Sequence, residues 1–523
     1  MSAKAGLALA ALLLSPVSPV LGNPAGPSWK RSTPQPDPAR ASEVKEVFRT
    51  AWNGYYKNAF PHDTLKPISG GASDDRNAWG VTAIDALSTA IILGESETVN
   101  QILKHVATID FTTTKEANSS VSLFETNIRY LGGLIAGYDL LKGPSKKLVN
   151  GANSKSVDAL LHQAKTLADS LSIAFDTPTG IPDDAVILNP TRRINGSDTN
   201  GPAGFGTLVL EWTRLSDLTG NETYARLAQK AQKYLVEPTG VPEAYPGLVG
   251  ITVNIKDGRF TNNRGGWGGG IDSFYEYLIK MYLYDPKEFA HYKDRWVLAA
   301  DSTMKHLASH PTSRKDLTFL AGHNGPRIVP ASGHLASFAG GNFILAGVLL
   351  DEPKYTEFGI ALANSYYETY AQTASKIGPE VFRWVPAETV AGNVTAPPAQ
   401  DADFYAKAGF WAVYKDYVLR PETIESLYYA YRVTGDKRYQ DMAWGAFTAV
   451  RDRCRAGSGF SGLEDVTRED GGQRNDFQES FFLAETLKYS YLVFAENSEV
   501  HFHGHGKNHF VYNTEAHPFR VRG

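Results

Sequence analysis

The sequence predicts an all-α fold, an α/α barrel in which about seven inner helices are each paired with an outer helix. One observation is a repeated unit, in which an apolar, aromatic-rich helix is followed by a short turn and a more polar helix. A second is the irregular spacing of the units, which excludes a solenoid of short period. A third is the C-terminal stretch 509–518, which alternates like a strand and turn rather than a helix. We expect this strand to enter the barrel.

The units follow one another from Ser42, where a helical pattern begins, to the C-terminal strand. The first complete unit joins the apolar helix 79–93 to an amphipathic partner at 97–105. Long loops are expected at 175–182 and 384–407, and loops of this length in a compact domain are usually functional. The units begin near Trp79, Leu123, Gly206, Asp272, His334, Pro421 and Phe481.

The N-terminus is typical of a secretory signal peptide, which we place at residues 1–22. Lys4 precedes an apolar run that is too short to span a bilayer, and no other stretch is long enough to do so. Residues 23–42 are rich in proline and polar side chains, and we expect them to be disordered. Residues 43–523 are then predicted to form a single catalytic domain of a secreted protein.

Charge and cysteine content restrict the partners of the protein. The net charge of −4 argues against a nucleic acid or an anionic membrane, but it leaves a neutral ligand such as a sugar open. Cys454 is the single cysteine, so no intramolecular disulfide can form. The secretory route is consistent with four N-glycosylation acceptors, which are Asn118, Asn195, Asn221 and Asn393.

Acidic residues stand near one end of several apolar helices. Glu422 and Glu425 follow Pro421 in the first turn of one of them and share a face. On a single helix, such acids would simply be exposed to water and interact favourably with the helix dipole. The pattern recurs, however, because Glu125, Asp272 and Glu485 lie in three other apolar, aromatic-rich helices. If these helices line one barrel, the acids meet in one acidic pocket.

Paired carboxyl groups of this kind indicate glycoside hydrolysis, in which one protonates the leaving oxygen and another activates water or attacks carbon. Lyases and lectins also use acidic clefts in barrels, so the acids alone leave these classes open. The glycine run 265–270 is not a phosphate loop, since no Gly-Lys-Ser/Thr follows it.

Seven motifs in order carry a resemblance to a known family, and they span about residues 43 to 519. The sequence resembles the class I α-1,2-mannosidases, the inverting family-47 glycoside hydrolases, and is most similar to their secreted fungal members. The resemblance implies an (α/α)7 barrel plugged by a C-terminal β-hairpin. The motifs are 79–87, 123–130, 175–182, 272–278, 420–426, 481–488 and 513–518.

The resemblance also implies catalytic roles. Glu422 matches the general base that activates water, Glu125 matches the general acid, and Asp272 matches a third essential carboxylate that rivals Glu125 as proton donor. An inverting enzyme needs its two carboxyls roughly 6.5–9.5 Å apart to admit the water. The implied contacts to the sugars come from Phe481 beneath the mannose, from Arg420 and His334 beside it, and from Glu211 at the neighbouring sugar.

The resemblance further implies one Ca²⁺ at the barrel floor, bound by Thr514 and by water, with oxygen ligands that suit this hard cation. Carboxylates would hold its waters. These are Glu425, Glu485, Glu515 and, as a weaker candidate, Asp85.

Two positions depart from the family pattern. Ser337 and Tyr366 occupy the places of a family disulfide, which is absent here. Gly270 stands where members that remove a single mannose carry arginine, so we expect several mannoses to be removed in succession.

The sequence therefore predicts a Ca²⁺-dependent, monomeric, inverting exo-α-1,2-mannosidase that trims high-mannose N-glycans on glycoproteins. The alternative is a non-catalytic, lectin-like relative that binds mannose in glycoprotein quality control, and the intact Glu125, Asp272 and Glu422 argue against it. Another α/α-barrel carbohydrate enzyme would not explain Thr514 and Glu515 in a C-terminal strand.

Overall fold

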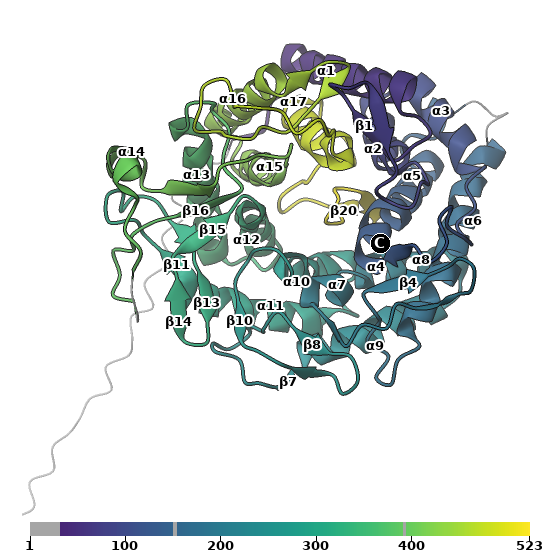
Figure 1. Cartoon of the computed structure of the whole chain (residues 1–523), viewed down its shortest axis with the longest axis horizontal. Helices are drawn as coiled ribbons and strands as arrows, with labels where there is room; N and C mark the ends of the chain where they lie inside the picture. Colours follow the sequence, from purple (N-terminus) through teal and green to yellow (C-terminus); the bar gives the residue numbers. More distant parts are fainter. Residues whose placement is uncertain (1–31, 150–153, 391–393, 523) are drawn as a thin grey trace, which may run out of the picture.

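The structure is a computed structural model that describes residues 32–149, 154–390 and 394–522. In these ranges seven inner helical segments form a closed ring, and an outer helix packs on each of them (Figure 1). The inner segments are α2 (Val81–Leu93), α4–η1–α5 (Leu123–Glu125, Thr126–Leu131, Gly132–Lys142), α8 (Val209–Thr219), α10 (Asp272–Tyr284), α12 (Phe338–Leu349), α15 (Glu422–Thr434) and η8–α17 (Phe482–Thr486, Leu487–Phe494). The outer helices are α3 (Ser96–Val106), α6 (Ser154–Leu171), α9 (Thr223–Val236), α11 (Ala290–Ser302), α13 (Pro353–Gln372), α16 (Lys437–Arg453) and α1 (Pro38–Asn58), which closes the ring against α17.

The predicted all-α barrel of helical hairpins is confirmed, and each inner segment begins within a few residues of its predicted start. The inner helices are buried on nearly every side, as their apolar composition requires. Glycine allows a close contact between α12 and α13 in the ring. A Cβ on Gly347 would lie 2.4 Å from the backbone nitrogen of Thr356, so no larger residue fits there without movement.

Two expected boundaries differ from the structure. Helix α1 begins at Pro38, inside the segment 23–42 that we expected to be disordered, because Asp37 caps it by accepting a hydrogen bond from the backbone of Arg40. The expected loop 384–407 contains most of a short helix, α14 (Ala402–Ala408). The signal peptide predicted at residues 1–22 lies outside the described residues, as does Asn393.

Short strands at the rim and the centre lead the chain into the site. In the antiparallel sheet β3–β4–β5 (Ser120–Ser122, Ala185–Ile187, Arg193–Ile194), strand β3 ends just before Glu125. In the sheet β15–β16–β17 (Ala331–Gly333, Val381–Arg383, Trp411–Tyr414), strand β15 ends just before His334. The hairpin β20–β21 (Phe510–Tyr512, Pro518–Arg520) lies inside the ring and pairs Tyr512 with Pro518 (Figure 1). The prediction of a C-terminal strand within the barrel is therefore confirmed.

The remaining elements are short and connect the hairpins. The other strands are β1 (Thr64–Lys66), β2 (Gly71–Ser73), β6 (Thr199–Asn200), β7 (Thr239–Gly240), β8 (Val253–Asn254), β9 (Arg259–Phe260), β10 (Arg264–Gly265), β11 (Ala308–Ser309), β12 (Phe319–Leu320), β13 (Gly322–Asn324), β14 (Arg327–Val329), β18 (Arg455–Ala456) and β19 (Gly459–Phe460). The other helices are α7 (Pro202–Gly206), η2 (Lys146–Leu148), η4 (Ser172–Phe175), η5 (Thr303–Leu307), η6 (Leu335–Ser337) and η7 (Ala399–Asp401). None of the helices in the described ranges combines the length and apolarity that crossing a membrane requires.

Candidate active site

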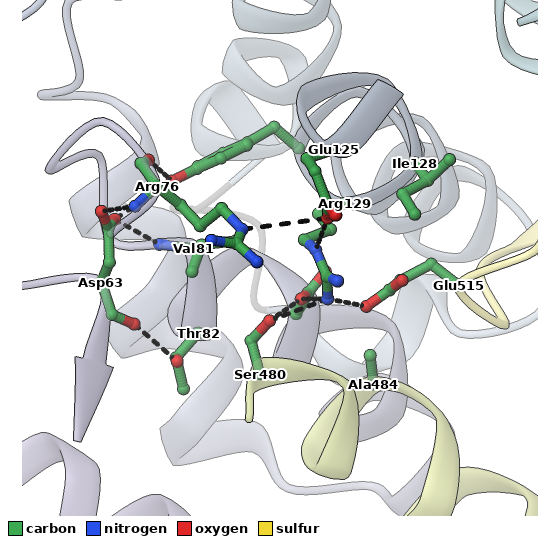
Figure 2. A network of polar contacts seen from close by, with 12 residues as sticks. Asp63, Arg76, Val81, Thr82, Glu125, Ile128, Arg129, Ser480, Ala484 and Glu515 are labelled. Atoms are coloured by element: carbon green, nitrogen blue, oxygen red, sulfur yellow. Dashed lines mark hydrogen bonds and ion pairs between the residues drawn. The ribbon is translucent and has the colours of Figure 1, made fainter. Parts of the chain in front are cut away.

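Arg129 joins two acids and a serine that come from three different parts of the chain (Figure 2). The short helix α4 places Glu125 four residues before Arg129, and the Arg129 Nε lies 2.7 Å from Glu125 Oε2. The Nη1 of the same guanidinium donates to Glu515 in the central hairpin and to Ser480, at 3.2 Å, just before η8. The side chain of Arg129 is 7% exposed, so these bonds form away from bulk water. One buried cation therefore fixes the mutual position of α4, the hairpin and the start of η8.

A second arginine acts on Glu125 from the opposite side. The Nε of Arg76 lies 3.8 Å from Glu125 Oε2. Asp63 holds the loop of Arg76 by accepting hydrogen bonds from backbone N–H groups of Arg76 and Val81, at 2.8 and 3.1 Å. Burial raises the pKa of Glu125, but the charges of Arg129 and Arg76 outweigh it and leave the pKa lowered. Glu125 is therefore ionised in this arrangement.

Glu422 begins α15 and is held by two cationic or polar neighbours. Its Oε2 lies 2.7 Å from Nδ1 of His334, and its Oε1 lies 3.8 Å from the guanidinium of Arg420. Burial raises the pKa of Glu422, yet the hydrogen bond from His334 and the charge of Arg420 lower it overall. Nε2 of His334 lies 2.6 Å from the hydroxyl of Tyr370. Both ring nitrogens of His334 are thus engaged by the protein.

Asp272 has the opposite electrostatic character. It begins α10 and accepts a hydrogen bond of 2.8 Å from the backbone N–H of Ser273. Burial raises the pKa of Asp272 to about 7, and the nearby negative charges of Glu276 and Glu422 raise it further. The hydrogen bond from the Ser273 N–H and the charge of Arg420 lower it, but by less. Asp272 can therefore keep a proton at a pH where Glu422 has lost its own.

Thr514 lies at the turn of the central hairpin. The side chain of Asn513 shapes this turn by accepting hydrogen bonds from the backbone of Glu515 and His517, at 2.9 and 2.8 Å. The backbone N–H of Thr514 donates to the hydroxyl of Tyr277 at 3.2 Å. Thr514 is partly exposed, whereas its neighbours in the turn are buried. Thr514 is therefore the residue of the turn that a ligand inside the ring can reach.

The acids around this turn carry more negative charge than the protein compensates. Burial raises the pKa of Glu425 to about 8, and burial with the charges of Glu515, Glu422 and Glu425 raises that of Glu485 well above its usual value. Burial also raises the pKa of Glu515 well above its usual value, although the charge of Arg129 acts in the opposite direction. In Asp85, burial is outweighed by the bond from His517 and the charge of Arg129, so its pKa is lowered.

A hard cation near Thr514 fits this donor set, because it would favour the ionised form of the surrounding carboxyls. In the described part of the chain, no three His, Cys, Asp or Glu side chains are arranged to ligate one metal directly.

Phe481 lies beside two arginines of the site, whereas Glu211 lies against the hairpin turn. The Phe481 ring is 7% exposed and has the guanidinium carbons of Arg129 and Arg420 at 5.5 and 5.9 Å from its centroid. Glu211 is fully buried, and its Oε1 accepts hydrogen bonds from Tyr277 at 2.6 Å and from Asn513 at 2.9 Å. Glu211 therefore supports the hairpin turn through Oε1, and its contact with a sugar stays a prediction.

The structure also shows functional residues that the sequence reasoning missed. Arg129 was detectable, because it stands four residues after Glu125 on the same helical face. Glu276 was detectable in the same way, since it pairs with Lys280 four residues on. Glu380 gave no signal, because it lies in a loop before β16, and only the fold brings its Oε2 within 2.6 Å of Arg420 Nε.

Comparison with known proteins decides the family. A sequence model of glycosyl hydrolase family 47 matches residues 47–521, which is almost the whole described chain. The chain belongs to glycosyl hydrolase family 47. Among its relatives in family 47, a mannosyl-oligosaccharide α-1,2-mannosidase of Penicillium citrinum is 52% identical over 94% of each chain. A mannosyl-oligosaccharide α-1,2-mannosidase 1B of Aspergillus phoenicis is 53% identical over 92% of each chain.

Structural comparison agrees with this assignment. The α-1,2-mannosidase from Trichoderma reesei superposes with a TM-score of 0.92 and 58% identity, covering 93% of this chain and all of that one. The family-47 chain described here is therefore a glycoside hydrolase with the (α/α)7 fold.

Proposed function

We propose that the protein is an inverting exo-α-1,2-mannosidase that removes terminal mannose from high-mannose N-glycans and depends on Ca²⁺. The observation that carries the proposal is the contrast between two carboxyl groups in one site. The pKa of Glu422 is lowered by His334 and Arg420, whereas burial raises that of Asp272 to about 7. Carboxyls held in opposite protonation states are what a general acid and a general base require.

In this mechanism Glu422 is the general base. Its ionised carboxylate accepts a proton from the water that attacks the anomeric carbon, and His334 holds the carboxylate in place. Arg420 stands between Glu422 and Glu380, and its charge opposes the effect of burial on both acids. The pKa of Glu422 is lowered overall, whereas burial leaves the pKa of Glu380 raised. Inversion follows because the water attacks from the face opposite the leaving oxygen.

Asp272 is the proton donor that the electrostatics favour. A carboxyl with a pKa of about 7 is protonated over most of the acidic range, so it can protonate the leaving oxygen. Glu125 has a lowered pKa beside Arg129 and Arg76, which suits a charge that stabilises the oxocarbenium-like transition state. This assignment differs from the roles that the family resemblance implies, in which Glu125 is the acid.

Thr514 would hold the Ca²⁺, and Glu425, Glu485 and Glu515 would accept hydrogen bonds from its waters. The ion when bound would orient the attacking water and the sugar hydroxyls. Gly270 supports the removal of several mannoses, because a Cβ there would have no atom within 4 Å and the space beside Asp272 stays open. The exposed side chains of Asn118, Asn195 and Asn221 are compatible with the secreted, glycosylated protein that we also propose.

Proton NMR of a high-mannose oligosaccharide incubated with the protein tests this function. We expect β-mannose as the first anomer released, with release lost after chelation and restored by Ca²⁺. Release of α-mannose first would overturn the inverting mechanism and the role of Glu422. A glycan that is bound but not cleaved in the presence of Ca²⁺ would favour the lectin-like alternative. Activity that persists after complete chelation would overturn the dependence on Ca²⁺.

A further inference from the structure

The segment 76–80, which joins β2 to α2, has an unusual backbone. Asn77, Ala78 and Gly80 all lie in the left-handed region, with φ of 77°, 59° and 76°. Residues other than glycine rarely adopt this conformation, because the Cβ crowds the following carbonyl oxygen. At Gly80 a Cβ would also lie 2.9 Å from the carbonyl oxygen of Pro61, so no larger residue fits without movement. Strain of this kind persists only where the surrounding structure enforces it, and it is concentrated at functional sites.

The carboxylate of Asp63 enforces this backbone. Its Oδ2 accepts hydrogen bonds from the backbone N–H groups of Arg76 and Ala78, both at 2.8 Å. Its Oδ1 accepts from those of Gly80 and Val81, at 2.8 and 3.1 Å. Asp63 is fully buried, and four donors on one carboxylate fix the path of the chain between them. An asparagine could not replace it, because the amide nitrogen would face two of the donors.

The side chain that this strained segment presents to the site is Arg76 (Figure 2). Its Nε lies 3.8 Å from Oε2 of Glu125, and its Nη1 lies 3.1 Å from Oδ2 of Asp75. The hydroxyl of Tyr130 donates to the carbonyl oxygen of Arg76 at 2.6 Å. Tyr130 belongs to η1, which begins directly after Glu125, so this bond fixes Arg76 relative to Glu125. The conformation of segment 76–80 therefore sets where the guanidinium of Arg76 lies.

Charged groups face Glu125 from four elements. They are Arg129 in η1, Arg76 before α2, Asp85 in α2 and Glu515 in the central hairpin. Arg129 is shared among the acids, because it also pairs with Glu515 and lies 3.5 Å from Asp85. Arg76 supplies the second positive charge, and the two arginines together leave the pKa of Glu125 lowered in spite of burial. The position of Arg76 therefore matters for the charge of Glu125.

We propose that Asp63 is a positioning residue of the reaction, which holds the strained segment 76–80 so that Arg76 stays beside Glu125 and supports its negative charge. Asp63 is fully buried and acts through Arg76, without touching the substrate. The inference rests on the proposed mannosidase function, in which the charge of Glu125 stabilises the transition state. It assigns the strain at Asn77 and Ala78 a purpose, which is to keep a cation at a fixed place in the catalytic centre.

The test measures kcat for α-1,2-mannobiose as a function of pH, in the presence of Ca²⁺. The wild type is compared with Asp63→Asn, Arg76→Met and the double variant. The acid limb of the profile reports the carboxyls that must be ionised, Glu125 among them. Glu243→Gln is the matched control, because Glu243 also holds a loop. It accepts a hydrogen bond of 2.9 Å from the backbone N–H of Gly247 and pairs with the buried Arg295.

We expect Asp63→Asn and Arg76→Met each to move the acid limb to higher pH by about one unit, because a neighbouring cation lowers the pKa of a carboxyl by at least this much. On the acid side of the profile, kcat should then fall about tenfold. The double variant should match Arg76→Met, because Asp63 acts through Arg76. Glu243→Gln should leave the acid limb where it is in the wild type.

An acid limb that stays in place in either single variant would overturn the proposal. So would a shift by Asp63→Asn that adds in full to that of Arg76→Met, or an equal shift in Glu243→Gln, which would assign the effect to lost stability. Circular dichroism verifies the folding of each variant. If Asp63→Asn does not fold, Tyr130→Phe takes its place. It removes the bond to the carbonyl of Arg76 and should move the limb in the same direction, and an unmoved limb would refute the role of segment 76–80.

A wild-type protein that does not cleave mannobiose would contradict the proposed function rather than this inference. Hydrogen exchange then decides the role of Asp63 alone. The backbone N–H groups of residues 76–81 should exchange faster in Asp63→Asn than in the wild type, because four of them lose a full carboxylate acceptor. Equal protection in the two proteins would show that Asp63 does not hold the segment.

Discussion

Nδ1 of His334 lies 2.7 Å from Oε2 of Glu422, and Nε2 of the same ring lies 2.6 Å from the hydroxyl of Tyr370. Burial raises the pKa of Tyr370 well above its usual value, so its hydroxyl stays protonated and keeps a hydrogen bond with Nε2. The ionised carboxylate of Glu422 can only accept, so Nδ1 carries a proton that points at Glu422. Tyr370 therefore orients Glu422, the proposed base, through His334.

Tyr370→Phe tests this relay. We expect kcat to fall about 3- to 10-fold with KM unchanged, because the loss of one hydrogen bond is worth about 0.5–1.5 kcal/mol and misplaces only the base. Steady-state kinetics on mannobiose measures both constants. Tyr367→Phe on the same helix is the control. A rise in KM with constant kcat would contradict the positioning role.

Asp272→Asn separates the acid from the base. The variant should lose about 10²- to 10⁴-fold in kcat on mannobiose, as the removal of a general acid does. It should be far less impaired on α-mannosyl fluoride, whose leaving group needs no proton. Glu422→Gln should fail on both substrates. If Glu125→Gln is rescued by the fluoride and Asp272→Asn is not, Glu125 is the acid.

The same assignment fixes the pH profile of the wild type. Asp272 is protonated below about pH 7 and Glu422 is ionised above its own lowered pKa, so kcat/KM should be high between these limits. Activity should therefore fall as the pH rises through about 7. A rate that keeps increasing from pH 6 to 9 would be incompatible with Asp272 as donor.

Arg129→Met should lower the free energy of unfolding by about 3–5 kcal/mol, because it leaves buried Glu515 and Asp85 without their shared cation. Denaturant unfolding followed by fluorescence measures the change. Arg49→Met is the control, since Arg49 pairs with Glu46 and Glu95 at the surface and should contribute about 1 kcal/mol or less. Equal losses in the two variants would show that Arg129 has no special structural role.

The stability of the chelator-treated protein should depend on pH in an unusual direction. Glu425, Glu211 and Asp272 have folded-state pKa values of about 8, 7 and 7, above those of the unfolded chain. At these three groups the native state binds more protons than the unfolded chain, so the stability that they contribute is fully present below about pH 4 and is lost as the pH rises toward 8. Thermal unfolding in chelator at pH 5, 6, 7 and 8 measures this trend, and a Tm that rises over this range would contradict it.

Local signals made much of the fold predictable from the sequence. Pro421 and Glu422 marked the first turn of α15, and the glycine run before Asp272 marked the start of α10. The site was less predictable from the sequence, because its geometry depends on contacts between segments that are distant in the chain. No spacing rule places Glu380 beside Arg420, and none shows that Glu211 accepts a hydrogen bond from Asn513 in the hairpin.

The hairpin that carries Thr514 follows all seven inner segments in the chain. All seven inner segments can therefore be synthesised before the residues that complete the centre. The part of the site around Thr514 forms only once the last segment of the chain has been made.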